Sequence, residues 1–277
     1  MSKSKPSLRL DPEPGRPGPS VAGRTALVAA AHAPAVVLAA GAWWGWAITA
    51  LLAAHAVLLA GTLLPRVRWF GPLVTRCLAE GPGLPVWLTI DDGPCPKDTR
   101  AILDLLARQG ARATFFLVGD RARCHPDLVA AIRQAGHGIA NHTRSHPARS
   151  FWRLGPQALD REIGGGQADL TEEDNTCPML FRAPAGMHNP WVAPILRRHR
   201  LRLVGWSRRA FDTVRRDVPA MVDALTRGLS AGEILLVHQG TPHSVELLEA
   251  VLHRLGAQGA RCVLPDGGGG EVRNEER

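Results

Sequence analysis

Several features are missing from this 277-residue chain, and each absence narrows its possible class. It contains no tyrosine, which excludes any ligand contact that depends on that side chain. Its five cysteines are an odd number without CxxC spacing, so no disulfide or zinc framework is evident and a reducing compartment is favoured. The net charge is +8, but the basic residues form no patch interleaved with aromatic side chains. Nucleic-acid binding is therefore not expected.

Charge is also absent from the stretch between Thr25 and Leu64, which has no Lys, Arg, Asp or Glu. A membrane-spanning helix needs ~20 apolar residues, so this stretch is long enough for two. Small residues and indoles between Gly41 and Trp46 lie at its centre, as in a tight turn at a membrane interface. We therefore predict two short transmembrane helices. The alternatives are a single uncleaved span or a buried hairpin of a soluble protein; a cleavable signal peptide is disfavoured because its apolar core has only ~7–15 residues.

The residues that flank this stretch predict its orientation. The basic residues are Lys3, Lys5, Arg9, Arg16 and Arg24 on one side and Arg66, Arg68 and Arg76 on the other. Because both flanks are basic and the turn is uncharged, the positive-inside rule places both ends in the cytoplasm. We expect a multi-pass protein of the inner or plasma membrane whose C-terminal domain is cytoplasmic. A single span would instead put that domain outside.

Strand-like and helical patterns alternate from Val86 onward. The predicted strands are 86–90, 113–118, 138–141, 179–182, 201–206, 233–238 and 261–264. The predicted helices are 98–109, 126–135, 156–170, 189–198, 219–229 and 244–255, and the three glycines at 164–166 should break or bend the third. This alternation predicts an α/β fold with a parallel sheet, closed or nearly closed as a barrel. The predicted organisation is a disordered tail (1–24), the membrane segment (25–64), a linker (65–85), the α/β domain (86–265) and a second disordered tail (266–277).

Polar residues gather at the predicted carboxyl ends of these strands, where such folds place their chemistry. His142 and His146 lie four residues apart, so a helical turn would bring both imidazoles to one side. With Asp92 they could hold a divalent ion and leave positions open for water and substrate. Asp91 cannot point the same way as Asp92 in an extended chain, so it would be free to take a proton from water activated by that ion. Arg182, at another strand end, could orient Asp91 and keep it ionised.

His238 ends the apolar strand at 233–238 and could protonate a leaving amine from the side opposite Asp91. Asp212 could hold that imidazole in its protonated form. A base, a metal site and an acid together predict hydrolysis of an amide or ester through a tetrahedral intermediate. Each residue alone also fits a structural role, since adjacent aspartates often form a turn and a single histidine often lies in a core. It is their coincidence at strand ends that favours a site.

Other histidines and tryptophans have plainer interpretations. His137 is expected to bond a backbone carbonyl in the core rather than a metal. Trp152, Trp191 and Trp206 could stack on a sugar, but core packing is expected for at least two of them.

Five short segments carry a resemblance to a known family. In chain order they are Thr89–Pro94 (TIDDGP), Ala113–Phe116 (ATFF), Asn141–Pro147 (NHTRSHP), Phe181–Gly186 (FRAPAG) and Leu235–His238 (LLVH). Together they resemble the T-F-D-D-G-P, A-T-F-F, N-H-[ST]-x-x-H, R-x-P-x-G and L-x-x-H motifs of polysaccharide deacetylases of the NodB-homology type, carbohydrate esterase family 4. The resemblance covers about residues 86–265.

This resemblance implies a distorted (β/α)7 barrel that removes N-acetyl groups from amino sugars with a divalent metal, commonly zinc. It implies that Asp91 is the base, that Arg182 orients it, and that His238 is the acid. The implied metal ligands are Asp92, His142 and His146.

The chain departs from the family at the D-x-x-D-W motif. Arg209 falls at the first aspartate and Thr213 at the tryptophan, whereas Asp212, expected to tune His238, is present. We therefore predict a membrane-anchored deacetylase of an N-acyl amino sugar in a polysaccharide or glycolipid. One alternative is a deformylase or deacetylase of a lipid-linked sugar at the cytoplasmic face. Others are a non-catalytic glycan-binding scaffold and, less favoured, an iron oxygenase, which also uses two histidines and one carboxylate.

Overall fold

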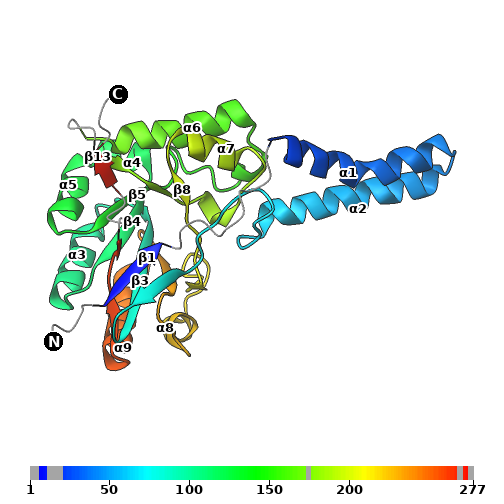
Figure 1. Ribbon diagram of the computed structural model, residues 1–277. Coiled ribbons are helices and arrows are strands. Elements are labelled where there is room, and N and C mark those ends of the chain that lie inside the picture. The colour runs from blue at the N-terminus through cyan, green and yellow to red at the C-terminus, as the bar shows by residue number, and fades with distance from the viewer. Residues whose placement is uncertain (1–5, 11–20, 173–175, 267–270, 274–277) are drawn as a thin grey trace.

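A curled parallel sheet forms the centre of the computed structural model, which describes residues 6–10, 21–172, 176–266 and 271–273. Its strands lie in the order β8-β7-β5-β4-β3-β10-β9, and β11 pairs with the start of β3 (Figure 1). Their bounds are β3 (Leu84–Gly93), β4 (Ala113–Leu117), β5 (Gly138–Asn141), β7 (Leu180–Phe181), β8 (Arg202–Leu203), β9 (Arg208–Arg209), β10 (Ile234–His238) and β11 (Ala260–Cys262). This half-barrel confirms the predicted α/β class and fits a (β/α)7 fold.

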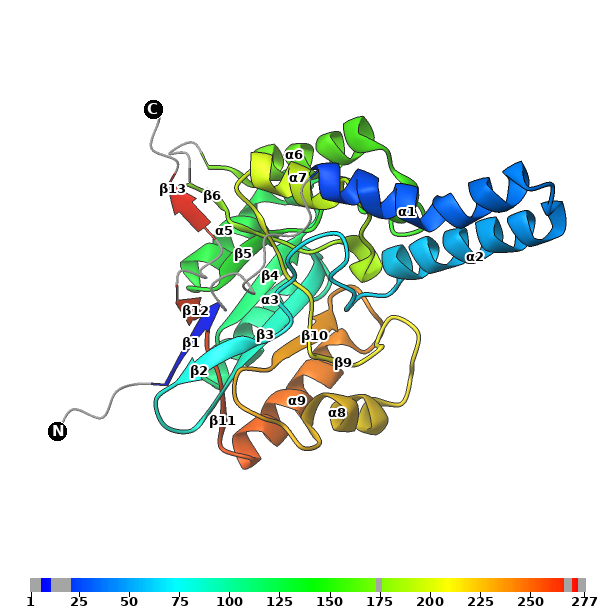
Figure 2. The same ribbon diagram turned by 45° about the vertical axis from the view of Figure 1, so that its right-hand side comes forward.

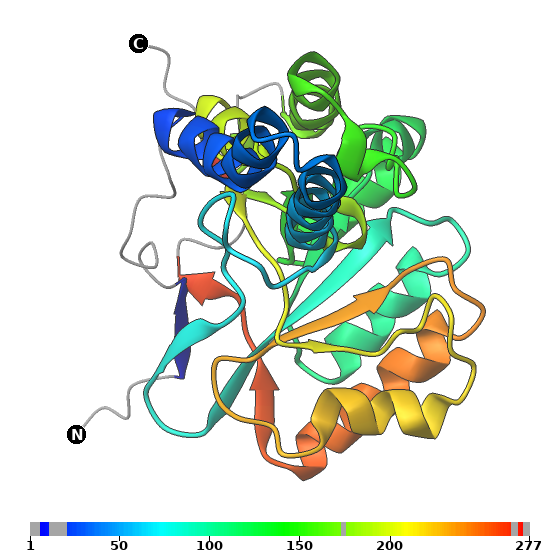
Figure 3. The same cartoon turned by 90° about the vertical axis from the view of Figure 1, so that its right-hand side faces the viewer.

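Helices cover the outer side of the sheet and are best seen in Figure 3. They are α3 (Thr99–Arg108), α4 (Gly119–Cys124), α5 (Pro126–Gln134), α6 (Pro156–Leu170), α7 (Val192–Arg198), α8 (Val218–Thr226) and α9 (Ser244–Ala257), with 3-10 turns η1 (Phe151–Arg153) and η2 (Pro184–Gly186). Small pairings add β1 (Ser7–Leu10), β2 (Cys77–Glu80), β6 (Thr176–Pro178), β12 (Pro265–Asp266) and β13 (Glu271–Arg273). The helix α4 and the short strand β2 were not predicted.

The central strand β3 is buried on both faces, which explains its almost continuous apolar sequence. Leu88 and Ile90 pack outward against helices such as α3 and α9, whereas Trp87 packs inward with Phe116 and Trp206. Both clusters are close to fully buried. The strand ends that carry the polar residues are therefore held between two packed layers.

Residues 65–85, predicted as a linker, are instead packed into the domain. Val74 bridges Val204 beside β8, and the amide of Cys77 donates to the carbonyl of Gly232 at 2.8 Å. Phe70 and Leu73 are also buried. The segment thus lies along the open side of the half-barrel, where it covers apolar surface (Figure 2).

The two predicted tails are only partly described. Strand β1 lies inside the tail predicted over 1–24 and pairs with β2 and β12, with Leu8 fully buried. Strand β13 lies inside the tail predicted over 266–277 and pairs with β6. These segments are therefore ordered parts of the fold, and most of the other tail residues lie outside the described ranges.

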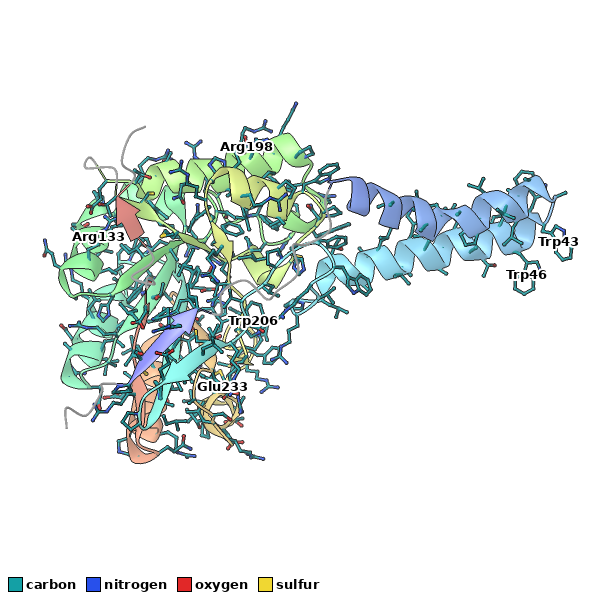
Figure 4. All side chains as sticks on the ribbon, viewed as in Figure 1. Trp43, Trp46, Arg133, Arg198, Trp206 and Glu233 are labelled. Atoms are coloured by element: carbon teal, nitrogen blue, oxygen red, sulfur yellow. The ribbon has the colours of Figure 1, made fainter. Side chains whose placement is uncertain are left out.

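Two antiparallel helices, α1 (Val21–Ala40) and α2 (Trp44–Leu63), project from the domain as a hairpin (Figure 1). Trp43 and Trp46 are exposed at its far end (Figure 4). Of the described helices, only α2 is long and apolar enough to cross a membrane, with a mean hydropathy of 1.8. The apolar part of α1 is the shorter segment Val28–Ala40. Two membrane spans therefore remain a prediction.

Helix α6 runs without a break through the three glycines at 164–166, so the predicted interruption is wrong. The glycines serve packing instead. A Cβ on Gly166 would lie 2.7 Å from Asn141 Oδ1 and 2.7 Å from the carbonyl carbon of Thr143. Because the helix lacks side chains here, it lies directly against the segment that follows β5. That contact helps to position His142.

Candidate active site

Asp91 and Asp92 point in different directions at the end of β3. The register with β4 shifts between Asp91 and Gly93, and Asp92 has a left-handed backbone with φ of 68°. Such a conformation is uncommon for a residue with a side chain, and residues of this kind cluster at functional sites. The irregularity directs Asp91 toward Arg182 and Asp92 toward the two histidines. The adjacent carboxylates are thereby available for separate tasks.

Arg182 holds Asp91 in a fully buried ion pair. Its Nη1 lies 2.6 Å from Asp91 Oδ1 and also donates to Thr89 Oγ1 at 2.9 Å. The other guanidinium nitrogens donate to the backbone carbonyls of Val204 and Gly205. With every nitrogen bonded, the guanidinium has one orientation, and it holds Asp91 Oδ1 in one place. Sequence reasoning did not assign Thr89, although a threonine in an otherwise apolar strand was a visible signal.

Asp92, His142 and His146 form a group whose ligand atoms all lie within 4.8 Å of one another. Asp92 Oδ1 is 3.4 Å from His142 Nε2 and 3.1 Å from His146 Nε2, yet this buried oxygen has no hydrogen-bond partner in the described part of the chain. A buried carboxylate oxygen without a donor is costly unless a cation binds it. Two imidazoles and one carboxylate are also a set that divalent ions accept. The residues therefore fit a metal ion.

Hydrogen bonding prepares His142 for that role. Its Nδ1 donates to the backbone carbonyl of Arg182 at 2.7 Å, which leaves the Nε2 lone pair facing Asp92 and His146. An imidazole fixed in this way is oriented as a metal ligand. The contact also links the metal group to Arg182, and so to Asp91.

The charge states of the other two ligands suit a cation as well. Burial raises the pKa of Asp92. The contact with His142 and the charges of the nearby histidines lower it by a larger amount, so the pKa of Asp92 lies well below its usual range. Burial, together with the neighbouring His142, lowers the pKa of His146 to about 4. At neutral pH the group therefore offers an ionised carboxylate and a neutral imidazole.

The spacing of the two histidines predicted that a helical turn brings them together, and this prediction is wrong. They lie in an irregular segment after β5, in which Thr143 and His146 have φ of 70° and 57°. The Thr143 hydroxyl accepts a hydrogen bond from the His146 amide, and Asn141 Oδ1 accepts one from the Thr143 amide. These bonds replace the helical ones and turn both rings toward Asp92.

His238 and Asp212 form the second buried pair of the site. His238 Nδ1 lies 2.8 Å from Asp212 Oδ1, and the His238 amide donates to Asp212 Oδ2 at 2.7 Å. Burial lowers the pKa of His238, but the bond to Asp212 and the charges of Asp212, Asp91 and Asp92 raise it above its usual value. The protonated form of the imidazole is therefore favoured, and Nε2 is directed away from Asp212, where it could act as a donor.

A cleft of about 660 Å³ adjoins the metal group. Its lining includes Lys97, Arg121, His125, Gln239 and Thr241. Gln239 Nε2 and Thr241 Oγ1 are buried without partners within the described ranges. These polar groups, which sequence reasoning missed because they lie outside the motifs, could bind sugar hydroxyls.

The three tryptophans considered for sugar stacking and the buried His137 lie outside the group of proposed catalytic residues. Trp206 and Trp152 pack into apolar clusters, and Trp191 is exposed, as expected for at least two core residues. The Trp206 ring centroid lies 6.0 Å from the guanidinium carbon of Arg182 and 5.2 Å from that of Arg209. His137 is buried as predicted, but its Nδ1 accepts from the Ala113 amide rather than bonding a carbonyl.

Comparison with known proteins agrees with this geometry. A family model described as polysaccharide deacetylase matches residues 79–204, which include the metal group and Arg182. The chitooligosaccharide deacetylase of Rhizobium leguminosarum bv. trifolii is 36% identical over 160 residues, 57% of this chain and 72% of that protein. The peptidoglycan-N-acetylglucosamine deacetylase of Bacillus cereus is 33% identical over 181 residues, 64% of this chain and 84% of that protein. A family 4 carbohydrate esterase from Streptomyces lividans, solved with acetate, has a TM-score of 0.60 at 30% identity and covers 70% of this chain and 98% of its own.

Proposed function

This chain belongs to the polysaccharide deacetylase family, carbohydrate esterase family 4, and is a hydrolase of N-acetyl amide bonds; from this premise we propose that it is a membrane-anchored, metal-dependent deacetylase of amino sugars in a glycan or glycolipid. Its substrate type is the N-acetylglucosamine of chitooligosaccharide or peptidoglycan. One observation carries the proposal: the unpaired oxygen of Asp92 faces His142 and His146, directly beside the Arg182-bound Asp91.

Asp92, His142 and His146 would hold the divalent ion, for which zinc is our proposal. An ion held by these residues would supply Lewis-acid chemistry, that is, polarisation of the acetyl carbonyl and a lower pKa of water. The His142–Arg182 backbone contact keeps the metal group and the base in one rigid unit. Its rigidity favours catalysis, because a ligand set that does not reorganise stabilises developing charge most effectively.

Asp91 is the proposed general base. Arg182 occupies its Oδ1, so Oδ2, 3.7 Å from His142 Nε2, is the oxygen free to accept a proton from the attacking water. His238 is the proposed general acid, because Asp212 holds it protonated. It would donate its Nε2 proton to the departing amine as the C–N bond breaks, which leaves acetate and a free amino sugar.

The test uses the purified full chain and N-acetylglucosamine oligomers. Acetate release should be detectable, and Asp91→Asn should lower kcat by about 10²–10⁴-fold, the usual range for loss of a general base. Unchanged turnover in that variant would refute the assigned mechanism. A protein that releases no acetate but still binds the oligomer would support the alternative of a glycan-binding scaffold.

Membrane attachment through α2 and its partner α1 is also proposed, with both ends and the domain in the cytoplasm. The apolar length of α2, the basic residues on both flanks and the exposed Trp43 at the far end support it. Cys124, exposed on the domain, offers a test. An impermeant maleimide should label it only after cells are lysed, and Cys124→Ser provides the background. Labelling of Cys124 in intact cells would place the domain outside.

A lipid-linked amino sugar is the second candidate substrate, and a specific contact favours it. The base of the hairpin lies against the loop that follows Arg182, where the His188 amide donates to the Thr62 carbonyl at 3.1 Å. In the same loop, a Cβ on Gly186 would lie 2.7 Å from the Pro65 side chain. The proposed membrane segment would therefore end beside the active site. Comparing soluble oligomers with polyprenyl-linked sugar as substrates would separate the two candidates.

A further inference from the structure

Arg209 is a half-buried cation beside the catalytic groups that forms no ion pair with any described residue. Its guanidinium carbon lies 4.2 Å from the Phe211 ring centroid and 5.2 Å from that of Trp206. Its Nε is buried without a hydrogen bond to the described part of the chain. The adjacent Arg208 differs, because its guanidinium bonds Glu233 and two backbone carbonyls. The two rings thus hold the Arg209 guanidinium in place, while its N–H donors have no hydrogen-bond partner among the described residues.

The nearby carboxylates form no ion pair or hydrogen bond with Arg209 in the described part of the chain. Burial lowers the pKa of Arg209, and the negative charges of Asp212 and Asp91 offset only part of that effect. Both oxygens of Asp212 already bond His238, and Asp91 Oδ1 is held by Arg182. A partly desolvated guanidinium with free donors is costly, and a bound anion would remove that cost.

The position of Arg209 indicates where that anion would come from. Arg66, just beyond the hairpin, donates to the Ser207 carbonyl at 2.6 Å, two residues before Arg209. The Trp206 ring contacts Arg209 and lies 6.0 Å from the guanidinium of Arg182, which binds the base. Arg209 therefore lies between the base of the hairpin and the catalytic pair.

We propose that Arg209 binds a phosphate group carried by the amino-sugar substrate, and so determines the substrate class of the proposed deacetylase. A planar guanidinium matches the oxygens of a phosphate in a bidentate geometry, and stacking on two aromatic rings fixes its plane in advance. The phosphate could belong to a soluble sugar phosphate or could link the sugar to a lipid. This inference rests on the proposed function for the deacetylation reaction, but the binding of phosphate by Arg209 does not depend on that function.

The kinetic test compares substrates that differ only in charge. Acetate release is measured with N-acetylglucosamine 1-phosphate, with its neutral methyl glycoside, and with a polyprenyl-phosphate-linked N-acetylglucosamine. The ratio of kcat/KM for the phosphorylated over the neutral sugar should fall about 10–100-fold in Arg209→Gln, mainly through KM, as expected for a lost charge-assisted hydrogen bond. Arg209→Lys should restore part of the ratio, because it keeps the charge without the planar stack. A higher kcat/KM for the lipid-linked form would identify the lipid as the source, and a higher value for the soluble form would identify a free sugar phosphate.

Arg215 provides the matched control. Its guanidinium lies 4.9 Å from the same Phe211 ring but is exposed, so Arg215→Gln should leave the ratio unchanged. Equal losses on neutral and phosphorylated sugars in Arg209→Gln would show a purely structural role and overturn the proposal. Wild-type protein with no preference for phosphate would also overturn it.

Binding is tested separately from turnover by calorimetry with N-acetylglucosamine 1-phosphate. The Kd should rise at least about 10-fold in Arg209→Gln, and an unchanged Kd would overturn the proposal. If the protein binds the ligand through Arg209 but hydrolyses none of the sugars, the proposed function fails and the phosphate site stands. If it hydrolyses the sugars with a Kd that does not depend on Arg209, the phosphate site fails and the proposed function stands.

Discussion

Replacing Asp212 by asparagine isolates the charge that supports the proposed acid. Asparagine has nearly the same shape, so the contact with the His238 backbone amide can persist while the negative charge is lost. In the native protein, burial lowers the pKa of His238, and the bond and charge of Asp212 outweigh that effect. Without the charge, burial should dominate and the pKa of His238 should fall.

The size of the change follows from the 2.8 Å bond between His238 Nδ1 and Asp212 Oδ1. A hydrogen bond to a charged group contributes about 1.5–3 kcal/mol, which corresponds to about 1–2 pKa units. The alkaline limb of the kcat/KM profile reports loss of the acid in the free enzyme, so it should move by about 1–2 units to lower pH. The pair also makes the stability of the fold depend on pH. Because the pKa of His238 is higher in the folded than in the unfolded protein, the stabilisation from this pair is complete below the unfolded pKa. It is lost as pH rises through the folded pKa.

The assay is acetate release from N-acetylglucosamine oligomers across the pH range, for wild type and Asp212→Asn. The variant should recover a larger fraction of wild-type activity on the acidic side. His238→Asn provides the reference, because it should remove the alkaline limb altogether. An alkaline limb that stays in place in Asp212→Asn would refute the assignment of His238 as the acid supported by Asp212.

Two buried positions outside the catalytic groups give further predictions. Burial, with the nearby charge of Arg112, lowers the pKa of His137 to about 4. The fold therefore favours neutral His137, and protonation of this residue below its unfolded pKa costs stability. Between about pH 7 and pH 5, urea titrations should show that wild type loses about 2 kcal/mol more stability than His137→Asn. Equal losses in the two proteins would contradict this. Gly166→Ala should destabilise the protein by about 1–3 kcal/mol in the same titrations, because its Cβ would meet the segment after β5. The control is Gly256→Ala in α9, where a Cβ would have no described atom within 4 Å. That variant should be neutral or stabilising by up to about 1 kcal/mol. A neutral Gly166→Ala would show that α6 can move away.

The positions of the proposed catalytic residues were predictable because each depends on local sequence. Asp91 and His238 end apolar strands, and parallel strands bring their carboxyl ends to one edge. The register confirms this, since His238 pairs directly with Asp91. Motifs in the right order then identified the residues that meet there.

The features that sequence reasoning missed depend on contacts distant in the chain. Residues 65–85 have no strong periodicity, yet Val74 meets Val204 along the open side of the half-barrel. Glycines 164–166 have low helix propensity, yet close packing of α6 against Thr143 requires them. The loop that orients His142 and His146 uses left-handed residues, for which spacing gives no signal. Helix spacing therefore predicted that His142 and His146 lie together, but through a local structure that is wrong.

The most direct test of the account measures metal content and acetate release in the same samples of the full chain. Wild type should hold about one divalent ion per chain, lose activity with a chelator and regain it with zinc. Folded His142→Ala should bind the ion at least about 10-fold more weakly and release little acetate. Wild type that deacetylates the oligomer at full rate after complete removal of its metal would contradict the central claim that Asp92, His142 and His146 act through a metal ion.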